Sequence, residues 1–291
     1  MAAQIIRKFT ARLAICAIAG VVAMAIFSAA AMPQGSAEDH LKRGDALHQK
    51  GDLDGAIAEY RAALKIDPNH LAAHTRLCVA LSDRVDLSPA IAECRAALKI
   101  DPDDAEAHYN LGIALYKTGD LNGSIAEYRA ALKINPNYAE AHTRIGNALD
   151  DKGDIDGEIA EYRAAVQINP NDAYPHQGLA IALHKKGDLD GCIVQSRIAL
   201  KFDPTLVSSH TLLAIALGQK HDLDGAIKEY RAALEIAPEN VNAHLGLGLT
   251  LEAKDDLNGA LDEYRRALSF DPDSESAREG IDRVTKLLEK K

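Results

Sequence analysis

Apolar residues recur along most of this chain at the spacing of amphipathic helices. In residues 105–138 one stripe consists of Leu111, Ala114 and Leu115. An i, i+3, i+4 stripe of this kind predicts a helix with one buried face. Gly119 follows and is suited to the left-handed backbone that often ends a helix.

A second stripe begins a few residues later and predicts a second helix. It consists of Ile125, Tyr128, Ala131 and Leu132. Pro136 stops this helix, because proline cannot continue helical hydrogen bonding. Asn122 is the predicted N-cap, and its counterparts are also capping residues: Asp54, Ser88, Asp156, Asp190, Asp224 and Asn258. Each unit is therefore expected to be a helical hairpin.

The unit recurs along residues 37–274, which hold seven copies of 34 residues. The most regular marker is the proline at the end of each copy: Pro68, Pro102, Pro136, Pro170, Pro204, Pro238 and Pro272. An exact period of this length predicts a repeat architecture in which each unit packs on its neighbours.

Small residues mark close helix contacts in each unit. With Ala37 as position one, positions eight, twenty and twenty-seven of the third unit are Gly112, Ser124 and Ala131. Position twenty-seven is alanine in all seven units. Position twenty-four is tyrosine in five units, while the second and fifth units have Cys94 and Ser196 there. We expect the helices of these two units to pack more loosely.

This pattern resembles the tetratricopeptide repeat family over 238 of the 291 residues. The resemblance implies an all-α, right-handed superhelical solenoid of helix-turn-helix hairpins. After it, residues 275–291 carry a helical stripe through Ile281, Val284 and Leu288. We expect a C-terminal capping helix there, since a solenoid needs a polar end over its last apolar surface, and a cap suggests a complete chain.

The first residues differ in composition from the repeats. Arg7, Lys8 and Arg12 precede an apolar run that ends in Ser28-Ala29-Ala30-Ala31. Residues 1–31 thus resemble a cleaved secretory signal peptide, with 32–36 as a short lead-in. This predicts a periplasmic or secreted protein. The alternative is that residues 1–32 remain as a membrane anchor, with the repeats facing the periplasm, because the apolar stretch from Leu13 to Met32 has 20 residues and can span a bilayer.

Charge argues against a nucleic-acid partner. The chain has 43 acidic and 33 basic residues and a net charge of −10. Removal of residues 1–31, which hold three basic and no acidic residues, brings the charge to −13. Phosphate contacts need clustered basic residues, and no basic block occurs.

Seven histidines at position four form a ladder: His40, His74, His108, His142, His176, His210 and His244. A metal ladder is one interpretation. We favour another, that histidine occupies a half-buried aromatic position, because equivalent positions of stacked hairpins lie about 10 Å apart, whereas metal ligands lie about 2 Å from one ion. No cofactor or metal is therefore expected.

Other chemistry is weakly indicated. Cys78 and Cys94 occupy positions eight and twenty-four of one hairpin, where they could form a disulfide or remain two buried thiols. No phosphate-binding loop, nucleophile elbow or zinc-binding helix motif occurs, and repeated acidic residues such as Asp120 are better explained as turn residues. We therefore expect no enzyme activity and no small-molecule substrate.

Specificity should lie at positions that vary between units. The resemblance places the concave wall on the first helix of each hairpin, mainly at positions two, five, nine, twelve and thirteen. The predicted groove residues are Tyr109, Ile113, Tyr116, Lys117, Asn147, Asp150, Asp151, Tyr174, Ile181 and His184. An asparagine ladder at position six, known from protein-glycosylating members, is missing, and Arg144 is among its replacements.

Together these patterns predict a non-catalytic scaffold that binds a protein or peptide along its groove. Apolar anchoring on tyrosines and polar selection around Asp150 and Asp151 would provide recognition. The alternative is a membrane-tethered envelope assembly factor, whose only membrane contact would be residues 1–32.

Overall fold

The computed structural model describes residues 35–290. This part of the chain contains fifteen helices and no strands. The predicted signal segment, 1–31, and most of the lead-in, 32–36, lie outside the described residues. Between residues 35 and 290, no helix is both long enough and apolar enough to cross a bilayer.

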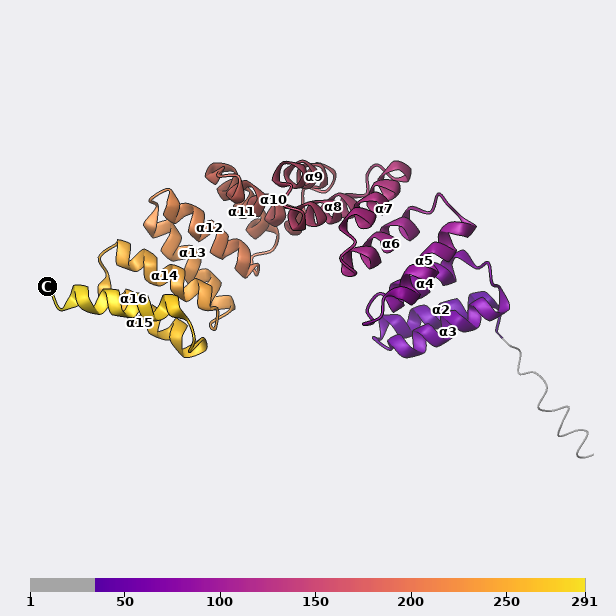
Figure 1. Ribbon diagram of the computed structural model, residues 1–291, viewed down its shortest axis with the longest axis horizontal. Helices are drawn as coiled ribbons and strands as arrows, with labels where there is room; N and C mark the ends of the chain where they lie inside the picture. Colours follow the sequence, from indigo (N-terminus) through magenta and orange to yellow (C-terminus); the bar gives the residue numbers. More distant parts are fainter. Residues whose placement is uncertain (1–34, 291) are drawn as a thin grey trace, which may run out of the picture. The chain divides into compact units, whose positions relative to one another are not determined.

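Consecutive helices pair into hairpins, one hairpin for each 34-residue unit, as the sequence pattern predicts (Figure 1). Their bounds are α2 Ala37–Gln49, α3 Leu53–Ile66, α4 Leu71–Leu81, α5 Ser88–Ile100, α6 Ala105–Lys117, α7 Leu121–Ile134, α8 Ala139–Asp151, α9 Ile155–Ile168, α10 Ala173–Lys185, α11 Leu189–Phe202, α12 Val207–Gln219, α13 Leu223–Ile236, α14 Val241–Ala253, α15 Leu257–Phe270 and α16 Glu275–Leu288. The all-α solenoid of helical hairpins is thus confirmed for this part of the chain.

The chain divides into two compact units, residues 1–80 and 81–291. In the described part of the first unit, α2 packs on α3, and Tyr60 lies buried between them. The Tyr60 hydroxyl donates to Asp45 Oδ1 over 2.8 Å. Arg76 Nε lies 3.6 Å from the same oxygen, so α4 is tied to this hairpin by charge.

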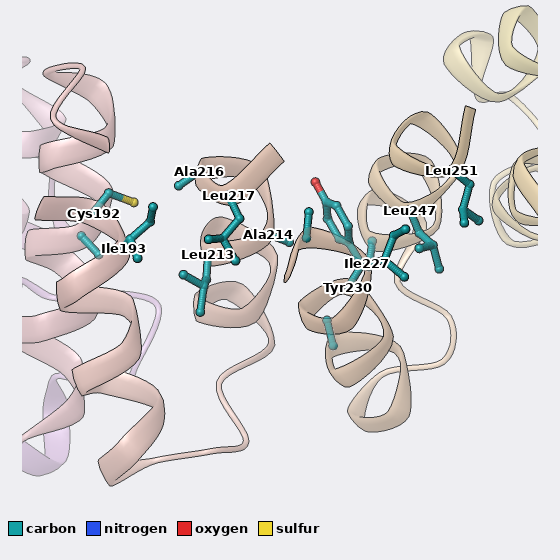
Figure 2. Packing of buried hydrophobic residues seen from close by; sticks show 14 of the residues in the cluster. Cys192, Ile193, Leu213, Ala214, Ala216, Leu217, Ile227, Tyr230, Leu247 and Leu251 are labelled. Carbon is teal, nitrogen blue, oxygen red and sulfur yellow. The ribbon is translucent and has the colours of Figure 1, made fainter. Parts of the chain in front are cut away.

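In the second unit, each hairpin packs on the next in sequence order. Their buried apolar residues form a core that runs from Ile159 in α9 to Val284 in α16. Figure 2 shows part of it, where Ile193 of α11 faces Leu213 of α12, and Ile227 of α13 lies beside Leu247 of α14. This core is continuous from α9 to α16, and a separate cluster around Tyr128 and Ile145 lies between α7 and α8.

The turn within each hairpin is close to the predicted one, but the helix cap is not. Gly119 has a φ of +84°, as predicted, and Gly51, Gly153 and Gly187 are also left-handed. The second helix, however, begins two residues earlier than expected. Its N-cap is Asp120, whose Oδ1 accepts from Gly123 N–H over 2.9 Å. The prediction of Asn122 as the cap was therefore wrong.

The same cap recurs in most repeats, at Asp52, Asp154, Asp188, Asp222 and Asp256. A Cβ on the glycine three residues later would lie 2.3–2.6 Å from the aspartate oxygen. The aspartate cap therefore depends on glycine three residues later in the sequence. The second repeat has Pro89 in place of this glycine, and α5 has no side-chain cap.

The last helix, α16, packs against α14 and α15, where a capping helix was expected. Gly280 lies against the ring of Tyr264, where a Cβ would meet the ring at 2.8 Å. Arg283 donates to both carboxylate oxygens of Glu252 over 2.7 and 2.8 Å. The helix covers the face of the seventh repeat that would otherwise be exposed.

Candidate functional site

The first helices of successive hairpins form one wall of the second unit. Helix α6 contacts α8, α8 contacts α10, and the series continues through α12 and α14 to α16. No two second helices of neighbouring hairpins make comparable contact among residues 81–290. The first helices therefore lie closer together than the second helices, so they line the inner side of the stack.

A cavity of about 530 Å³ opens on this wall. Its lining comes from α6, α8, α9 and α10 together with the cap of α10. The lining residues are Tyr109, Glu140, Thr143, Arg144, Asn147, Asp150, Tyr162, Asp172, Tyr174, Gln177, Gly178 and Ile181. This volume is within the range of ligand sites, which run from about 300 to 1,000 Å³.

Two tyrosines give the cavity its apolar surface. The ring of Tyr109 lies 4.8 Å from that of Tyr138 and 5.7 Å from that of Tyr128, which holds it in place. Tyr174 is 63% exposed at the start of α10. Its backbone N–H donates to the capping residue Asp172, so the position of its backbone is fixed while its ring is free.

Polar side chains of α8 point their donors toward the same space. The Tyr162 hydroxyl donates to Asn147 Oδ1 over 2.7 Å, which leaves the amide N–H groups of Asn147 to donate elsewhere. Arg144 is exposed, and its Nε donates to the Tyr109 hydroxyl over 3.4 Å. Arg144 has no ion pair within residues 35–290. The cavity thus combines aromatic surface with unused hydrogen-bond donors.

A second cavity, of about 560 Å³, continues the wall toward the C-terminus. It shares Ile181 with the first and extends over α12 to Asn240 and Asn242. Leu212 and Ile215 supply its apolar surface. The two cavities together form a groove that crosses the first helices of several repeats.

Five of the ten predicted groove residues line the first cavity. They are Tyr109, Asn147, Asp150, Tyr174 and Ile181. Their placement agrees with the predicted wall, while their role in binding stays a prediction. Asp150 is less available than expected, because Lys185 Nζ donates to its Oδ1.

The other five lie on the same helices but outside this cavity, and four of them bond across repeats. Tyr116 donates its hydroxyl to Asp151, and this bond raises the pKa of Tyr116 to about 12 with the help of burial. Lys117 donates to the Ser82 carbonyl over 2.7 Å, and its Nζ lies 3.2 Å from Asp83 Oδ1.

His184 Nε2 lies 3.1 Å from Gln219 Oε1, and Ile113 packs against the core beside Tyr128. These polar residues therefore join neighbouring first helices to each other. The expected polar selection around Asp150 and Asp151 competes with these bonds.

Sequence reasoning missed Arg144, Tyr162 and Gln177 as lining residues. Position six, which holds Arg144, was considered only for a missing asparagine ladder. Tyr162 occupies position twenty-four, the place of Tyr128 in the predicted apolar stripe, and it is 5% exposed. A pairwise comparison of residues 34 or 35 apart could have indicated Arg144, since it is the basic residue of the lining and has no acidic residue at that spacing.

An acidic side chain is buried beside this groove. Glu158 in α9 is 1% exposed, at position twenty, where the other repeats have alanine, serine or cysteine. Its Oε1 lies 3.9 Å from Lys185 Nζ, and its Oε2 has no hydrogen-bond partner. Burial, followed by the hydrogen bond and charge of Asp150, raises the pKa of Glu158 to about 7.

Cys78 and Cys94, for which the sequence left a disulfide and two buried thiols open, are both fully buried. They belong to different compact units, and their pairing stays a prediction. Mass measurement after alkylation without reductant would test it. Cys192 is a buried free thiol, and burial raises its pKa.

The described residues contain no group of three His, Cys, Asp or Glu side chains that could hold a metal ion. The position-four histidines instead lie at the start of each first helix, buried or half-buried, as the favoured interpretation expected. They contact glutamate, glutamine or proline carbonyl groups rather than one another.

Repeated helical hairpins that line a groove define the class of repeat scaffold proteins. Residues 44–82, 86–119, 114–153 and 146–187 match the family described as TPR repeat, and residues 211–275 match that described as tetratricopeptide repeat. The chain belongs to the tetratricopeptide repeat family. No curated protein matches the sequence.

Solved structures show the same fold. A tetratricopeptide repeat protein of Cytophaga hutchinsonii is similar with a TM-score of 0.66, 17% identity, and coverage of 83% of this chain and 99% of that one. YrrB, described as having an unusual peptide-binding site, has a TM-score of 0.58, 20% identity, and coverage of 64% and 96%. MamA has a TM-score of 0.51, 30% identity, and coverage of 55% and 94%.

Proposed function

We propose that this protein is a non-catalytic interaction scaffold that binds an extended protein or peptide segment in the groove along α6, α8, α10 and α12. The main support is the cavity of about 530 Å³ that combines aromatic side chains with unused donors. Exposed apolar residues grouped in a concave surface are typical of partner sites.

Each part of the groove has a role in this proposal. The ring of Tyr174 offers apolar surface to a side chain of the partner. The Asn147 amide is fixed by Tyr162 and directs its N–H groups away from that bond. An extended peptide has unpaired backbone carbonyls, which such donors can bind. Arg144 adds a charged donor without a competing carboxylate bond.

A binding experiment with a displayed peptide library tests this proposal. Peptides selected on the wild-type protein should bind the double variant Tyr174→Ala, Arg144→Gln about tenfold more weakly or worse, since interface anchors contribute 1 kcal/mol or more each. Val194→Ser is the matched control, because Val194 is 50% exposed on α11, outside both cavities. Unchanged affinity of the selected peptides for the double variant would place their site elsewhere.

We also propose export, with removal of residues 1–31. The support is the basic start, the apolar run and the alanines that end it. N-terminal sequencing of the protein from its native membrane or envelope fraction tests this, and a start at Met32 is expected. An intact Met1 in the membrane fraction would instead favour the tethered assembly factor, with residues 1–32 as its anchor.

A further inference from the structure

A row of arginines follows the second helices of the repeats. Position twenty-five is arginine in every repeat: Arg61, Arg95, Arg129, Arg163, Arg197, Arg231 and Arg265. In α7, α9 and α11, which belong to one compact unit, these arginines are exposed, and so are Lys133 and Lys201 one turn later. Arg129, Lys133, Arg163, Arg197 and Lys201 form the outer basic patch. None of the five has an ion pair within residues 35–290.

The carboxylates of these three helices have partners of their own or are buried. Asp156 and Asp190 each bond a lysine of the next repeat. Glu127 and Glu161 contact the position-four histidines of their own repeats, and Glu158 is buried. The carboxylates are thus held by other parts of the protein, while the cations of the outer basic patch face solvent.

Acidic residues of the adjoining turns and loops lie away from the patch or are scarce. The capping aspartates are at the opposite end of each helix. Asp154, for example, precedes Arg163 by nine residues, about 13 Å along the helix axis. The residues after α7 and α9 are Asn135 and Asn169, where the first, second and seventh repeats have aspartate. Asp203, after α11, accepts hydrogen bonds within its own loop.

The sixth and seventh repeats limit the patch toward the C-terminus. In α13, Glu235 takes the place of the lysine one turn after Arg231. In α15, Asp262 Oδ1 lies 3.8 Å from Arg265 Nη1. These two arginines occupy the same repeat position as those of the patch but have acidic neighbours. The excess of positive charge is therefore local, in a chain whose net charge is −10.

Exposed apolar side chains lie among these cations. Val194, one turn before Arg197, is 50% exposed, and Phe202, directly after Lys201, is 38% exposed. Lys201 Nζ lies 5.4 Å from the centroid of the Phe202 ring. A hydrated polyanion would gain nothing from this apolar surface. The interface of an anionic bilayer, in contrast, attracts cations and also takes up apolar side chains.

We propose that the outer basic patch is a docking surface for a membrane that contains anionic lipids. The arginines would bind lipid phosphates, which their planar guanidinium groups fit well, and Val194 and Phe202 would lie at the boundary with the acyl chains. The apolar stretch of residues 13–32 brings the chain to a membrane, whether as a signal or as an anchor. Docked in this way, the solenoid would keep the groove on its first helices open to a partner.

Binding of the full chain to vesicles tests this proposal. The wild type should bind vesicles of phosphatidylcholine with phosphatidylglycerol more tightly than vesicles of phosphatidylcholine alone, and added salt should weaken the difference. The triple variant Arg129→Gln, Arg163→Gln, Arg197→Gln should bind the anionic vesicles about tenfold more weakly than the wild type, or worse. A wild type without preference for the anionic vesicles would overturn the proposal.

The matched control is the triple variant Arg61→Gln, Arg231→Gln, Arg265→Gln. It loses the same three charges from the same repeat position, outside the patch, so its net charge equals that of the patch variant. It should bind anionic vesicles within about twofold of the wild type. All three proteins keep residues 1–32, so the contribution of that segment is the same in each. Equal weakening in both variants would indicate a general effect of charge and contradict the proposal.

A local measurement covers the case in which residues 1–32 alone hold the chain on the vesicle. An environment-sensitive fluorophore attached to Val194→Cys should shift its emission to the blue on anionic vesicles. The same fluorophore on Leu249→Cys, at a site 55% exposed on the first helix α14, should not shift. An unchanged spectrum at Val194→Cys would refute membrane docking. Patch-dependent binding of polyglutamate without affinity for anionic vesicles would instead assign the patch to an acidic protein.

Discussion

At the scale of single residues, packing of the repeats depends on a tyrosine that lies over a glycine. Tyr128 is fully buried, and a Cβ added to Gly112 would meet its ring at 2.6 Å. Tyr60 and Tyr264 have the same relation to Gly44 and Gly248. Where tyrosine is absent from position twenty-four, as at Ser196, position eight is Ala180 rather than glycine. The sixth repeat differs, because it combines Tyr230 with Ala214 at position eight, so the close contact of ring and glycine belongs to individual repeats.

The contact at Gly112 predicts opposite effects for two glycine-to-alanine changes in helices. Gly112→Ala should lower the free energy of unfolding by about 1–3 kcal/mol, because the overpacked ring has no space to move into. Gly218→Ala, whose Cβ would have its nearest neighbour at 3.9 Å, should raise it by about 0.5–1 kcal/mol through helix propensity. Urea denaturation of both variants measures this, and a stabilised Gly112→Ala protein would contradict it.

Glu158 is the residue whose chemistry departs most from its position in the repeat. Its raised pKa means that the folded protein holds this proton to higher pH than the unfolded chain. The stability that depends on this proton is complete below the ordinary glutamate pKa and is lost as the pH rises from about 4.5 to about 7.

Replacement of Glu158 by alanine, the residue found at this position in four other repeats, should therefore stabilise the protein. At pH 8 we expect the free energy of unfolding to rise by about 1–3 kcal/mol, the usual cost of a buried unsatisfied polar group. The gain should shrink as the pH falls toward 4.5, because the wild-type carboxyl is then protonated. Denaturation curves at pH 5 and 8 give both values; a gain that does not depend on pH would indicate a packing effect alone.

At the scale of elements, the helices could be predicted almost completely from the sequence, while their caps could not. The stripes and prolines place α6 and α7 correctly because apolar periodicity fixes which residues are buried. The cap is ambiguous, since Asp120 and Asn122 are both capping residues. Only the contact between the Asp120 carboxylate and Gly123 decides between them, and a search for aspartate three residues before glycine would have indicated it.

The turn before the second helix contains a residue whose replacement should stabilise the protein. Four repeats place glycine at the left-handed residue of this turn, but the sixth has His221 with a φ of 64°. His221→Gly should raise the free energy of unfolding by about 0.5–1.5 kcal/mol, since a side chain is unfavourable in this conformation. Gly153→Ala, the reverse change in an equivalent turn, should be destabilising by a similar amount. Thermal denaturation of both variants checks the sign, and destabilisation by His221→Gly would refute the argument.

At the scale of the whole molecule, each repeat is stabilised by its neighbours, and the last one depends on α16. Removal of residues 275–291 would expose the face of Tyr264 that lies against Gly280, and would break the contact of Arg283 with Glu252. We expect a lower melting temperature and self-association by size-exclusion chromatography, because the uncovered apolar surface can pair with another copy.

Arg283→Ala is the matched control for this deletion. It removes the ion pair with Glu252 but keeps the helix over the seventh repeat, so it should stay monomeric if the wild type is. A truncated protein with the wild-type melting temperature would show that α16 is not needed as a cap.

The groove was the part that the sequence predicted least completely. The wall could be assigned to the first helices, and Tyr109, Asn147 and Tyr174 do line the cavity. The roles of charged side chains could not be assigned, because they depend on partners one repeat away. Lys185 bonds Asp150, and Tyr116 bonds Asp151, whereas Arg144 has no such ionic partner in the described residues.

The regular bonds between adjacent hairpins carry a consequence for how this molecule can change in evolution. Lys186 contacts Asp156, and Lys220 and Lys254 contact Asp190 and Asp224 at the same spacing of 30 residues. Every such bond links one repeat only to the next. Duplication or loss of a complete 34-residue segment within the array would recreate the same junctions on both sides. The length of the array can thus change by whole repeats without a new set of contacts.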